Sequence, residues 1–510
     1  MFTTRKPAVR PSFVLSALGG LAIAAGVFGA GTMTSRAQDA AAHDDSARIR
    51  LAMLQPPRSG LTPLSDDAFK LSRWSNAETL IRLDPNGLPQ PFLATEWAQV
   101  DDHTWRFVIR EGVKFHDGTD LTSERVVASL TAATLAAPKP RILDGVELEI
   151  TADGEDAVLV RSRDVDPLIP NRLSSPQLAI LAERAYGADG RVNPIEAGTG
   201  PFVLREINGT ASARLDRFED YWGERAQAAG IDADYVPDGT ARAAALRTGT
   251  AHIVEAIPVS QAALLDQALI HEVPMPRTNT LYLNTETGTF ADPEMRRIAA
   301  AAIDRETIVR MVYEGRADVA RGLLGPALPW ADGLRTAVDA PEPGDAGGAG
   351  IVLATFTDRA ELPEVAVLLE QQLTQAGFKV TMEVRQYAHI EADALAGRFD
   401  AFILSRATVL DSGDPVAYMF SDFSCSGSFN IAQLCDEGVD AALRRAAEAP
   451  AGEERQRAII EAEAAILATH AAVPMLHERV IQGEAAGITD AVRDPREREL
   501  VGARTHIRAE

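Results

Sequence analysis

The sequence lacks the common signatures of catalysis. It contains no G-x-S-x-G turn, no G-x-x-x-x-G-K loop and no H-E-x-x-H pair, since His477-Glu478 is not followed by a second histidine. The nine histidines are scattered, and no two of them stand at the spacing of metal ligands. These absences count against an enzyme, and we expect neither a cofactor nor a metal.

Long apolar runs are absent except at the N-terminus, where one extends from Phe13 to Gly31. Basic residues precede this run, and Ser35 and Ala37 supply the small side chains that a signal peptidase reads. We therefore predict a signal peptide over residues 1–37, cleaved near Ala37, and a periplasmic protein. The alternative is an uncleaved anchor, because the run approaches the ~20 residues that span a bilayer.

Cysteine is scarce, with only Cys425 and Cys435 in the whole chain. Ten positions separate the two, which is too wide for a redox C-x-x-C motif, and no further ligands stand nearby to complete a metal site. In the oxidising compartment to which a signal peptide leads, such a pair favours a disulfide. We predict a local disulfide that closes one loop.

Positive charge is in deficit, since 50 Lys and Arg face 73 Asp and Glu, a net charge of −23. The predicted signal peptide holds four basic residues and no acid, so its removal takes the net charge from −23 to −27. A surface of this sign repels phosphate backbones, and we expect no nucleic-acid partner. The remaining chain far exceeds the ~250 residues of a single core, which predicts two or more lobes.

Local patterns mark several elements. Residues 104–110 alternate between apolar and polar side chains, which is typical of a half-buried strand, and Thr122 or Ser123 can cap the helix that follows. Asp292 opens another helix with a capping side chain and a proline directly after it. Asp304 has the position of a cap for a second helix.

Residues 351–404 repeat strand and helix. This succession predicts an α/β fold with a partly parallel sheet. The glycine-rich segment 331–350 precedes a strand instead of following one, so we interpret it as a surface linker and not as a dinucleotide loop. The expected elements are a buried strand at 351–356, a helix closed by Gly377, an alternating strand at 378–384, a helix at 391–396 and a strand at 399–404.

A long motif carries a family resemblance. From Leu93 to Val126 the chain reads LATEWAQVDDHTWRFVIREGVKFHDGTDLTSERV, which closely resembles the signature of the extracellular solute-binding proteins of the peptide/nickel family, family 5. Further stretches follow in the family's order over nearly the whole remaining chain. They are Gly198–Phe202, Tyr221–Gly223, Leu281–Thr285, Gln375–Phe378, Asp411–Pro415 and Val473–Leu476.

The resemblance implies a two-lobed α/β fold of the periplasmic-binding-protein type (cluster C), with an extra subdomain and a ligand cleft between the lobes. Such a protein closes on its ligand and delivers it to an ABC permease with its ATPase subunits, and we expect it to act as a monomer. The implied limits are 46–80 plus 195–272 plus 478–510 for lobe I, 81–194 for the associated subdomain and 273–477 for lobe II.

The resemblance also implies ligand-binding residues. In the family's peptide binders, an aspartate at the position of Asp411 pairs with the ligand's α-amino group, and the main chain of Thr408, Val409 and Leu410 bonds to the ligand backbone. The alternative is a purely structural role, in which Asp411 or Asp414 caps the turn before Pro415. The cysteine pair is similar in placement to that of the dipeptide binders.

One departure concerns the arginine that holds a dipeptide's carboxylate. It would fall near Phe356, where this chain has no arginine, and Arg359 is a neighbour. Either Arg359 takes the role, or the ligand is longer, or it has no free carboxylate at that end.

Three hypotheses follow for the function. The first is a di- or oligopeptide binder of an importer. The second is a nickel or other metal-chelate binder of the same fold, which would use His116, His389 or an arginine near Arg406. The third and most remote is a secreted hydrolase.

Overall fold

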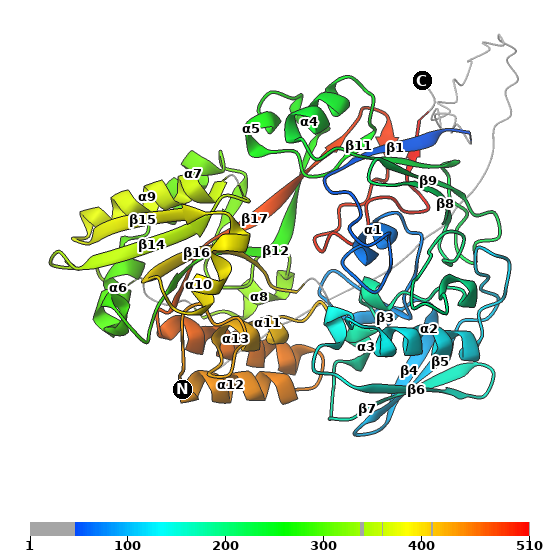
Figure 1. The fold of residues 1–510 in the computed structure, drawn as a ribbon, viewed down its shortest axis with the longest axis horizontal. Coiled ribbons are helices and arrows are strands. Elements are labelled where there is room, and N and C mark those ends of the chain that lie inside the picture. The colour runs from blue at the N-terminus through cyan, green and yellow to red at the C-terminus, as the bar shows by residue number, and fades with distance from the viewer. Residues whose placement is uncertain (1–45, 337–340, 360, 410–411, 509–510) are drawn as a thin grey trace, which may run out of the picture. The chain divides into compact units, whose positions relative to one another are not determined.

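A sheet of eleven strands runs through the computed structural model, which describes residues 46–336, 341–359, 361–409 and 412–508 (Figure 1). The predicted signal peptide, residues 1–37, lies outside the described residues. Among the helices of the described part, none has the length and apolar character that a membrane crossing requires.

The sheet is mixed. Strand β14 pairs in parallel with both β15 and β16, as the strand–helix–strand pattern predicts. The two longest strands, β12 and β17, pair antiparallel near the middle of the sheet. The spatial order is β15 (Lys379–Arg385), β14 (Gly350–Phe356), β16 (Ala401–Ala407), β12 (Ile270–Leu283), β17 (Ala472–Glu484), β11 (Ile253–Val254), β1 (Arg48–Met53), β10 (Gly230–Tyr235), β9 (Ser212–Arg217) and β8 (Phe202–Asn208), and β13 (Ala317–Val319) pairs with β17.

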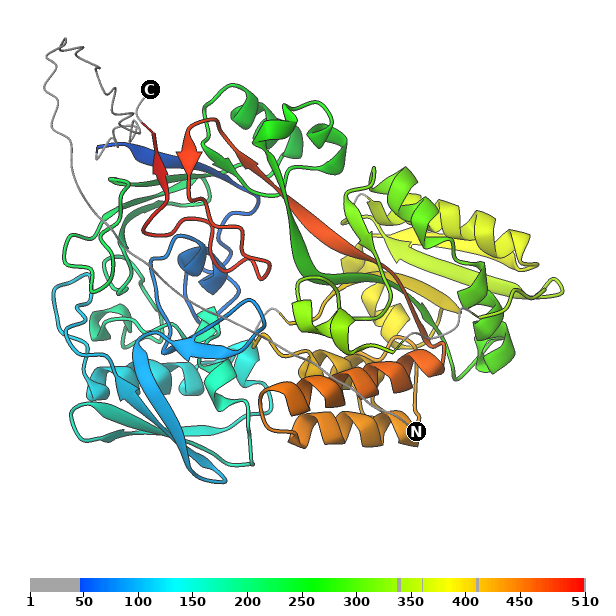
Figure 2. The same cartoon turned by 180° about the vertical axis from the view of Figure 1, so that it is seen from behind.

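Buried apolar side chains gather in two large cores. One contains Trp74 and Phe107, and we call the part of the chain built on it lobe I. The other contains Phe290 and Phe402, and we call its part lobe II. Strands β12 and β17 connect the two lobes, as both views show (Figures 1 and 2). Two lobes are therefore confirmed, while the predicted lobe limits stay a prediction.

The chain that precedes β12 carries a second sheet, antiparallel, in the order β4 (Ala94–Asp101), β5 (Thr104–Ile109), β7 (Ala157–Ser162) and β6 (Leu148–Asp153). Strand β5 confirms the predicted strand, and Thr122 Oγ1 accepts a hydrogen bond from Arg125 N–H at the start of the next helix. The other elements here are α1 (Ala68–Arg73), α2 (Ser123–Leu135), α3 (Ile169–Arg172), α4 (Gly239–Arg247), α5 (Val259–Ala262) and the pair β2 (Ile81–Leu83) with β3 (Pro89–Pro91); near the C-terminus β18 (Ile488–Thr489) pairs with β19 (His506–Ile507).

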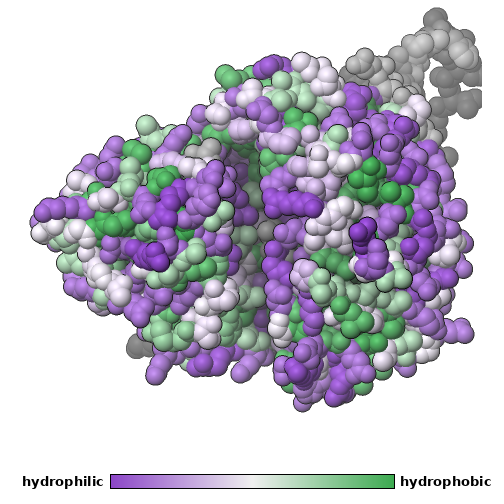
Figure 3. Space-filling view, in the orientation of Figure 1, coloured by the Kyte–Doolittle hydropathy of each residue, from purple (hydrophilic) through white to green (hydrophobic). Residues whose placement is uncertain are grey.

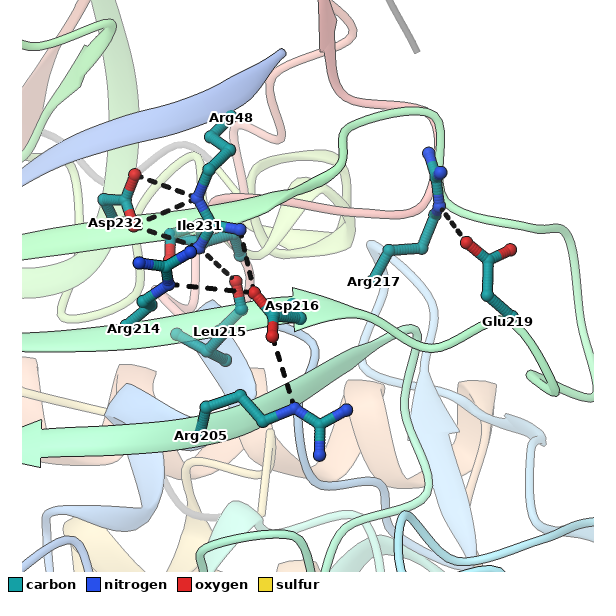
Figure 4. Close-up of polar contacts among 9 residues, drawn as sticks. All are labelled: Arg48, Arg205, Arg214, Leu215, Asp216, Arg217, Glu219, Ile231 and Asp232. Carbon is teal, nitrogen blue, oxygen red and sulfur yellow. Dashed lines mark hydrogen bonds and ion pairs between the residues drawn. The ribbon is translucent and has the colours of Figure 1, made fainter. Parts of the chain in front are cut away.

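Arg48, the first residue of β1, holds three strands of the main sheet together (Figure 4). Its Nε and Nη2 atoms donate to the carboxylate of Asp232 on β10, and Nη1 donates to Asp216 on β9 at 2.9 Å. Nη2 also donates to the carbonyl oxygens of Leu215 and Ile231. One guanidinium thus spans β1, β10 and β9.

Two of the family motifs meet at Glu78, a buried carboxylate of lobe I. It accepts hydrogen bonds from Thr199 Oγ1 at 2.7 Å, Tyr221 Oη at 2.7 Å and Trp222 Nε1 at 2.9 Å. Burial raises the pKa of Glu78 above its ordinary value. Because these motif side chains are all engaged with Glu78, they serve to hold lobe I together.

Lobe II has helices on both sides of its strands. Asp292 and Asp304 cap the first two of these helices through their carboxylates, as predicted. The helices are α6 (Pro293–Ala302), α7 (Arg305–Val312), α8 (Pro329–Leu334), α9 (Glu361–Gln375), α10 (Glu391–Leu395), α11 (Val416–Phe423), α12 (Glu437–Glu448) and α13 (Glu453–Ala468).

One expectation for lobe II is wrong in detail. The segment 331–350 is not all surface linker, because it begins inside α8, where Ala331 is 1% exposed. The strand predicted at 378–384 is confirmed as β15, and its apolar residues Met382 and Val384 are 36% and 39% exposed. The reason is that β15 forms the edge of the sheet, and this position cannot be read from alternation.

Candidate ligand-binding groove

A groove runs between the two lobes (Figure 3). Strands β12 and β17 cross from one lobe to the other, and their ladder is interrupted at the crossing. Pro274 pairs with Arg479 and Thr278 with His477, so three residues of β12 oppose the single residue Glu478 of β17. Proline has no N–H to give to a ladder, and this stretch of β12 contains two prolines, which accounts for the interruption.

The parallel strands β14 and β16 end side by side, since Leu353 pairs with Ala401 and both strands run on in the same direction. Ligands of open α/β sheets bind beyond the carboxyl ends of such strands. The segment after β14 carries Arg359, and the segment after β16 begins with Thr408. The topology therefore brings both predicted segments to one edge of the sheet, although Leu410 and Asp411 lie outside the described residues.

Arg359 is 35% exposed and forms an ion pair across the strand ends. Its Nη1 donates to Glu478 Oε2 at 2.8 Å, and the Glu478 side chain is 9% exposed. Glu361, at the start of α9, belongs to the same cluster: burial raises its pKa, and the negative charge of Glu478 adds to the rise. A mixed set of charges thus occupies this edge.

Arg406 is engaged within lobe II. Its Nε and Nη2 donate to the two carboxylate oxygens of the fully buried Asp422 at 2.9 and 2.8 Å. Its guanidinium also lies over the ring of Phe429, 4.1 Å from the centroid. Burial raises the pKa of Asp422 to about 6 despite the ion pair.

Thr408 and Val409 are buried, and their main chain takes part in internal hydrogen bonds. Thr408 N–H donates to the carbonyl oxygen of Pro276 at 2.8 Å, and Gly413 N–H donates to that of Val409 at 2.9 Å. These bonds tie the end of β16 to the interrupted stretch of β12. The loop after β16 is therefore anchored on the strand that joins the lobes.

Asp414 caps the turn at Pro415, the structural alternative given above for this residue. Its Oδ1 accepts from Val416 N–H at 2.9 Å, at the start of α11. Arg455 holds the same carboxylate with Nε and Nη2, at 2.6 and 3.1 Å. Arg455 Nη1 donates in addition to three carbonyl oxygens, those of residues 446, 447 and 449.

Arg277 was missed by the sequence analysis. It lies in the interrupted stretch of β12, and its Nη1 donates to the carbonyl oxygen of Ser405 at 3.2 Å. Burial lowers its pKa to about 10, and the positive charge of Arg359 contributes to the decrease. An arginine directly after two closely spaced prolines in a strand was the only available signal, since the family resemblance assigns nothing to this position.

Lobe I supplies the facing wall. Arg73 Nη1 lies 2.6 Å from Glu255 Oε1, and Arg73 Nη2 lies 3.6 Å from Glu497 Oε1. Glu497 is close enough to Arg277 to oppose the decrease in the pKa of that guanidinium, so the two lobes face each other here. Burial raises the pKa of the neighbouring Glu499 to about 7.

The predicted disulfide between Cys425 and Cys435 is present.

The two histidines of the metal-chelate hypothesis lie apart. His116 is buried in lobe I with Nε2 2.8 Å from the carbonyl oxygen of Gly200, and burial lowers its pKa to about 4. His389 is exposed on η6 (Tyr387–His389). Within the described ranges, no three His, Cys, Asp or Glu side chains form a group that could hold a metal ion.

Two lobes joined by crossing strands, with a groove between them, define a periplasmic binding protein of the two-lobed α/β class. A nickel ABC transporter protein from Bacillus halodurans has the same fold, with a TM-score of 0.78 at 22% identity over 91% of this chain and 100% of that one.

The chain belongs to the bacterial extracellular solute-binding proteins, family 5, whose middle region matches residues 89–430. The glutathione-binding protein GsiB of Salmonella paratyphi A is 25% identical over 445 residues, 80% of this chain and 85% of that protein. A probable di/tripeptide-binding protein of Pseudomonas aeruginosa is 25% identical over 442 residues, 77% of this chain and 82% of that protein.

Proposed function

We propose that this protein captures small peptides in the groove and passes them to an ABC permease. Two relatives that cover most of the chain are named for peptide ligands, glutathione in one case and di- and tripeptides in the other. A small peptide is a zwitterion, so a site for it must offer groups of both signs. Capture requires no chemistry, and we propose no catalytic role.

The observation that carries this proposal is the mixed charge at the ends of β14 and β16. Arg359 and Arg277 bring positive charge to this edge, and Glu478 and Glu361 bring negative charge. Asp411 follows on the loop after β16, and we propose that it takes the α-amino group of the peptide. The remaining main-chain groups of residues 408–410 would bind the ligand backbone.

The interrupted ladder between β12 and β17 supports a hinge. Because hydrogen bonds are missing where Pro274 and Pro276 stand, the angle between the lobes can change there at low cost. A ligand that contacts both lobes then favours the closed arrangement by its differential affinity. We also propose the lobe limits given by the family resemblance, a monomer as the working form, and ATPase and permease subunits as partners.

Calorimetric titration tests the ligand class. The protein, freed of co-purified ligand by unfolding and refolding, is titrated with glutathione, a dipeptide set, a tripeptide set and Ni(II)–histidine. We expect micromolar or tighter binding of at least one peptide and none of the nickel complex. Binding of the nickel complex alone would overturn the peptide proposal in favour of a chelate binder.

Three further measurements test the rest of the proposal. We expect the mature protein in the periplasmic fraction with its N-terminus near residue 38, a single-chain mass in solution, and no hydrolysis of a peptide or ester panel. A membrane-bound full-length chain would overturn the cleaved signal, and turnover would overturn the assignment as a carrier.

A further inference from the structure

Arg277 differs from the other arginines at the groove in its partners. Arg359 is paired with Glu478, and Arg406 with Asp422. Arg277 donates one hydrogen bond to a main-chain oxygen and has no carboxylate partner within the described part of the chain. Its Nε is buried and has no hydrogen-bond partner there either.

The free side of Arg277 is the side that binds carboxylates elsewhere in this molecule. Arg406 and Arg455 each use Nε and Nη2 together to hold both oxygens of one carboxylate. In Arg277 the Ser405 carbonyl accepts from Nη1, and no described residue accepts a hydrogen bond from Nε or Nη2. A guanidinium presents two parallel donors there, in the geometry that a carboxylate accepts.

Further unsatisfied atoms lie on the same face of the sheet. Arg277 pairs with Ala407 and Asn279 with Ser405, so these four residues point to one side, whereas Arg406 points to the other. Asn279 Oδ1 and Ser405 Oγ are buried without a hydrogen-bond partner among the described residues. Native proteins satisfy nearly all buried polar atoms, so these two atoms can receive hydrogen bonds from a polar group of a ligand or from a water molecule that accompanies it.

The partial burial of Arg277 without an ion-paired carboxylate in the described part of the chain is unfavourable in the ligand-free protein. A desolvated charge is costly unless an opposite charge compensates it. Arg359 and Arg406 repel Arg277, and the two acids that act on it, Glu478 and Glu497, are already paired with Arg359 and Arg73. A ligand carboxylate would remove this cost, and its binding free energy would become more favourable by the same amount.

We propose that the Nε–Nη2 side of Arg277 binds a carboxylate of the ligand. This inference rests on the proposed capture of peptides and specifies it: the ligand is a peptide with a free carboxylate at the end that reaches β12. Arg277 thereby replaces the arginine that is missing near Phe356. The carboxylate comes either from the C-terminus of the peptide or from an acidic side chain.

The test compares free acids with amides. Peptides that bind in the panel described above are titrated as the C-terminal acid and as the C-terminal amide, together with versions in which Glu or Asp is replaced by Gln or Asn. Each is measured on the wild type, R277M and R277K. The control is R444M, since Arg444 lies on the exposed side of α12 with a loose 3.9 Å contact to Asp440. Circular dichroism checks that each variant is folded.

We expect the wild type to bind the acid about 10- to 100-fold more tightly than the matching amide, as a charge-assisted bond requires. R277M should bind acid and amide alike, R277K should restore part of the preference, and R444M should behave as the wild type. Loss of the preference on C-terminal amidation identifies the terminal carboxylate, and loss on the Gln or Asn exchange identifies a side chain. Equal preference in wild type and R277M overturns the inference while peptide capture stands.

A second probe covers the case in which no peptide binds. Acetate, succinate and citrate are then added at millimolar concentration, and thermal unfolding is followed. An increase in Tm in the wild type that is absent in R277M supports the carboxylate site and rejects only peptide capture. The absence of any such increase overturns both.

Discussion

Two arginines of lobe II, the buried Arg455 and the half-buried Arg277, have opposite surroundings. Arg455 holds the carboxylate of Asp414 and three main-chain oxygens, so each of its nitrogens has a partner within the protein. Arg277 has one main-chain oxygen and no carboxylate within the described residues. Arg455 therefore stabilises the packing of helices, whereas Arg277, at the groove, keeps donors that a ligand can use.

The comparison shows why burial alone does not identify a ligand-binding residue. Arg455, Glu78 and Asp422 are all buried charged residues, and each has its partners in place. What distinguishes Arg277 is the unfilled part of its hydrogen-bonding capacity. Stability experiments should separate the two kinds of residue, because the first kind stabilises the ligand-free fold and the second kind does not.

The largest effect is expected for R455M. This change leaves Asp414 as a buried charge without its cation and strands three main-chain oxygens, so the free energy of unfolding should fall by about 3–5 kcal/mol. Urea denaturation measures it. The double variant R455M/D414N removes the stranded charge and should recover part of the loss. A loss below about 1 kcal/mol would show that Arg455 is no better partnered than Arg277.

A slightly smaller effect is expected for E78A, which strands the donors of Thr199, Tyr221 and Trp222. An unpaired donor costs about 1–3 kcal/mol when it is buried, and Tyr221 and Trp222 are only half-buried, so the free energy of unfolding should fall by about 3 kcal/mol. E78Q keeps an acceptor of the same shape and should lose clearly less in the same urea titration. Equal losses in the two variants would mean that packing, and not hydrogen bonding, holds this site.

Glu499 is a further groove residue that has no ion-paired cation within the described ranges, and its effect on stability should depend on pH. Burial raises its pKa from an ordinary value of 4.5 to about 7, so between these values the folded chain holds a proton that the unfolded chain has released. Its contribution to stability is therefore complete below about pH 4.5 and is lost as the pH rises through about 7. E499Q should be as stable as the wild type at pH 4.5 and more stable at pH 8. Parallel curves of unfolding free energy against pH would contradict this.

The smallest effect is expected for R277M in the ligand-free protein. Methionine keeps much of the apolar stem and removes a half-buried charge that has no ion-paired carboxylate among the described residues, so stability should change by about 1 kcal/mol or less, in either direction. The urea midpoint of R277M is compared directly with that of R455M. A loss as large as that of R455M would show that Arg277 has a partner in the fold and would remove the basis of the comparison.

The elements that local patterns specify were predicted well. Asp292, Asp304 and Thr122 cap their helices as predicted. Such caps can be predicted because the capping side chain accepts from an N–H group only two or three residues further along the chain. The disulfide also follows from two residues ten positions apart. Strand β15 was also placed correctly, whereas its position at the edge of the sheet depends on pairings that its own residues do not specify.

The groove depends on pairings over long distances, and the sequence contains little information on these. Arg455 finds Asp414 across 41 positions and Arg359 finds Glu478 across 119. Neither partner could have been chosen from a chain with 73 acidic residues. Arg277 was missed for the same reason, because its lack of a carboxylate appears only when every neighbouring acid has been assigned.

The position of Arg277 in the interrupted stretch of β12 bears on how ligand capture is communicated. This stretch belongs to one of the two strands that join the lobes, and Thr408, next to the proposed peptide site, is bonded to it at Pro276. A ligand bound here would act directly on the proposed hinge between the lobes. No relay of side chains through either lobe is then needed, because the segment that senses occupancy is also the segment whose bend sets the angle between the lobes.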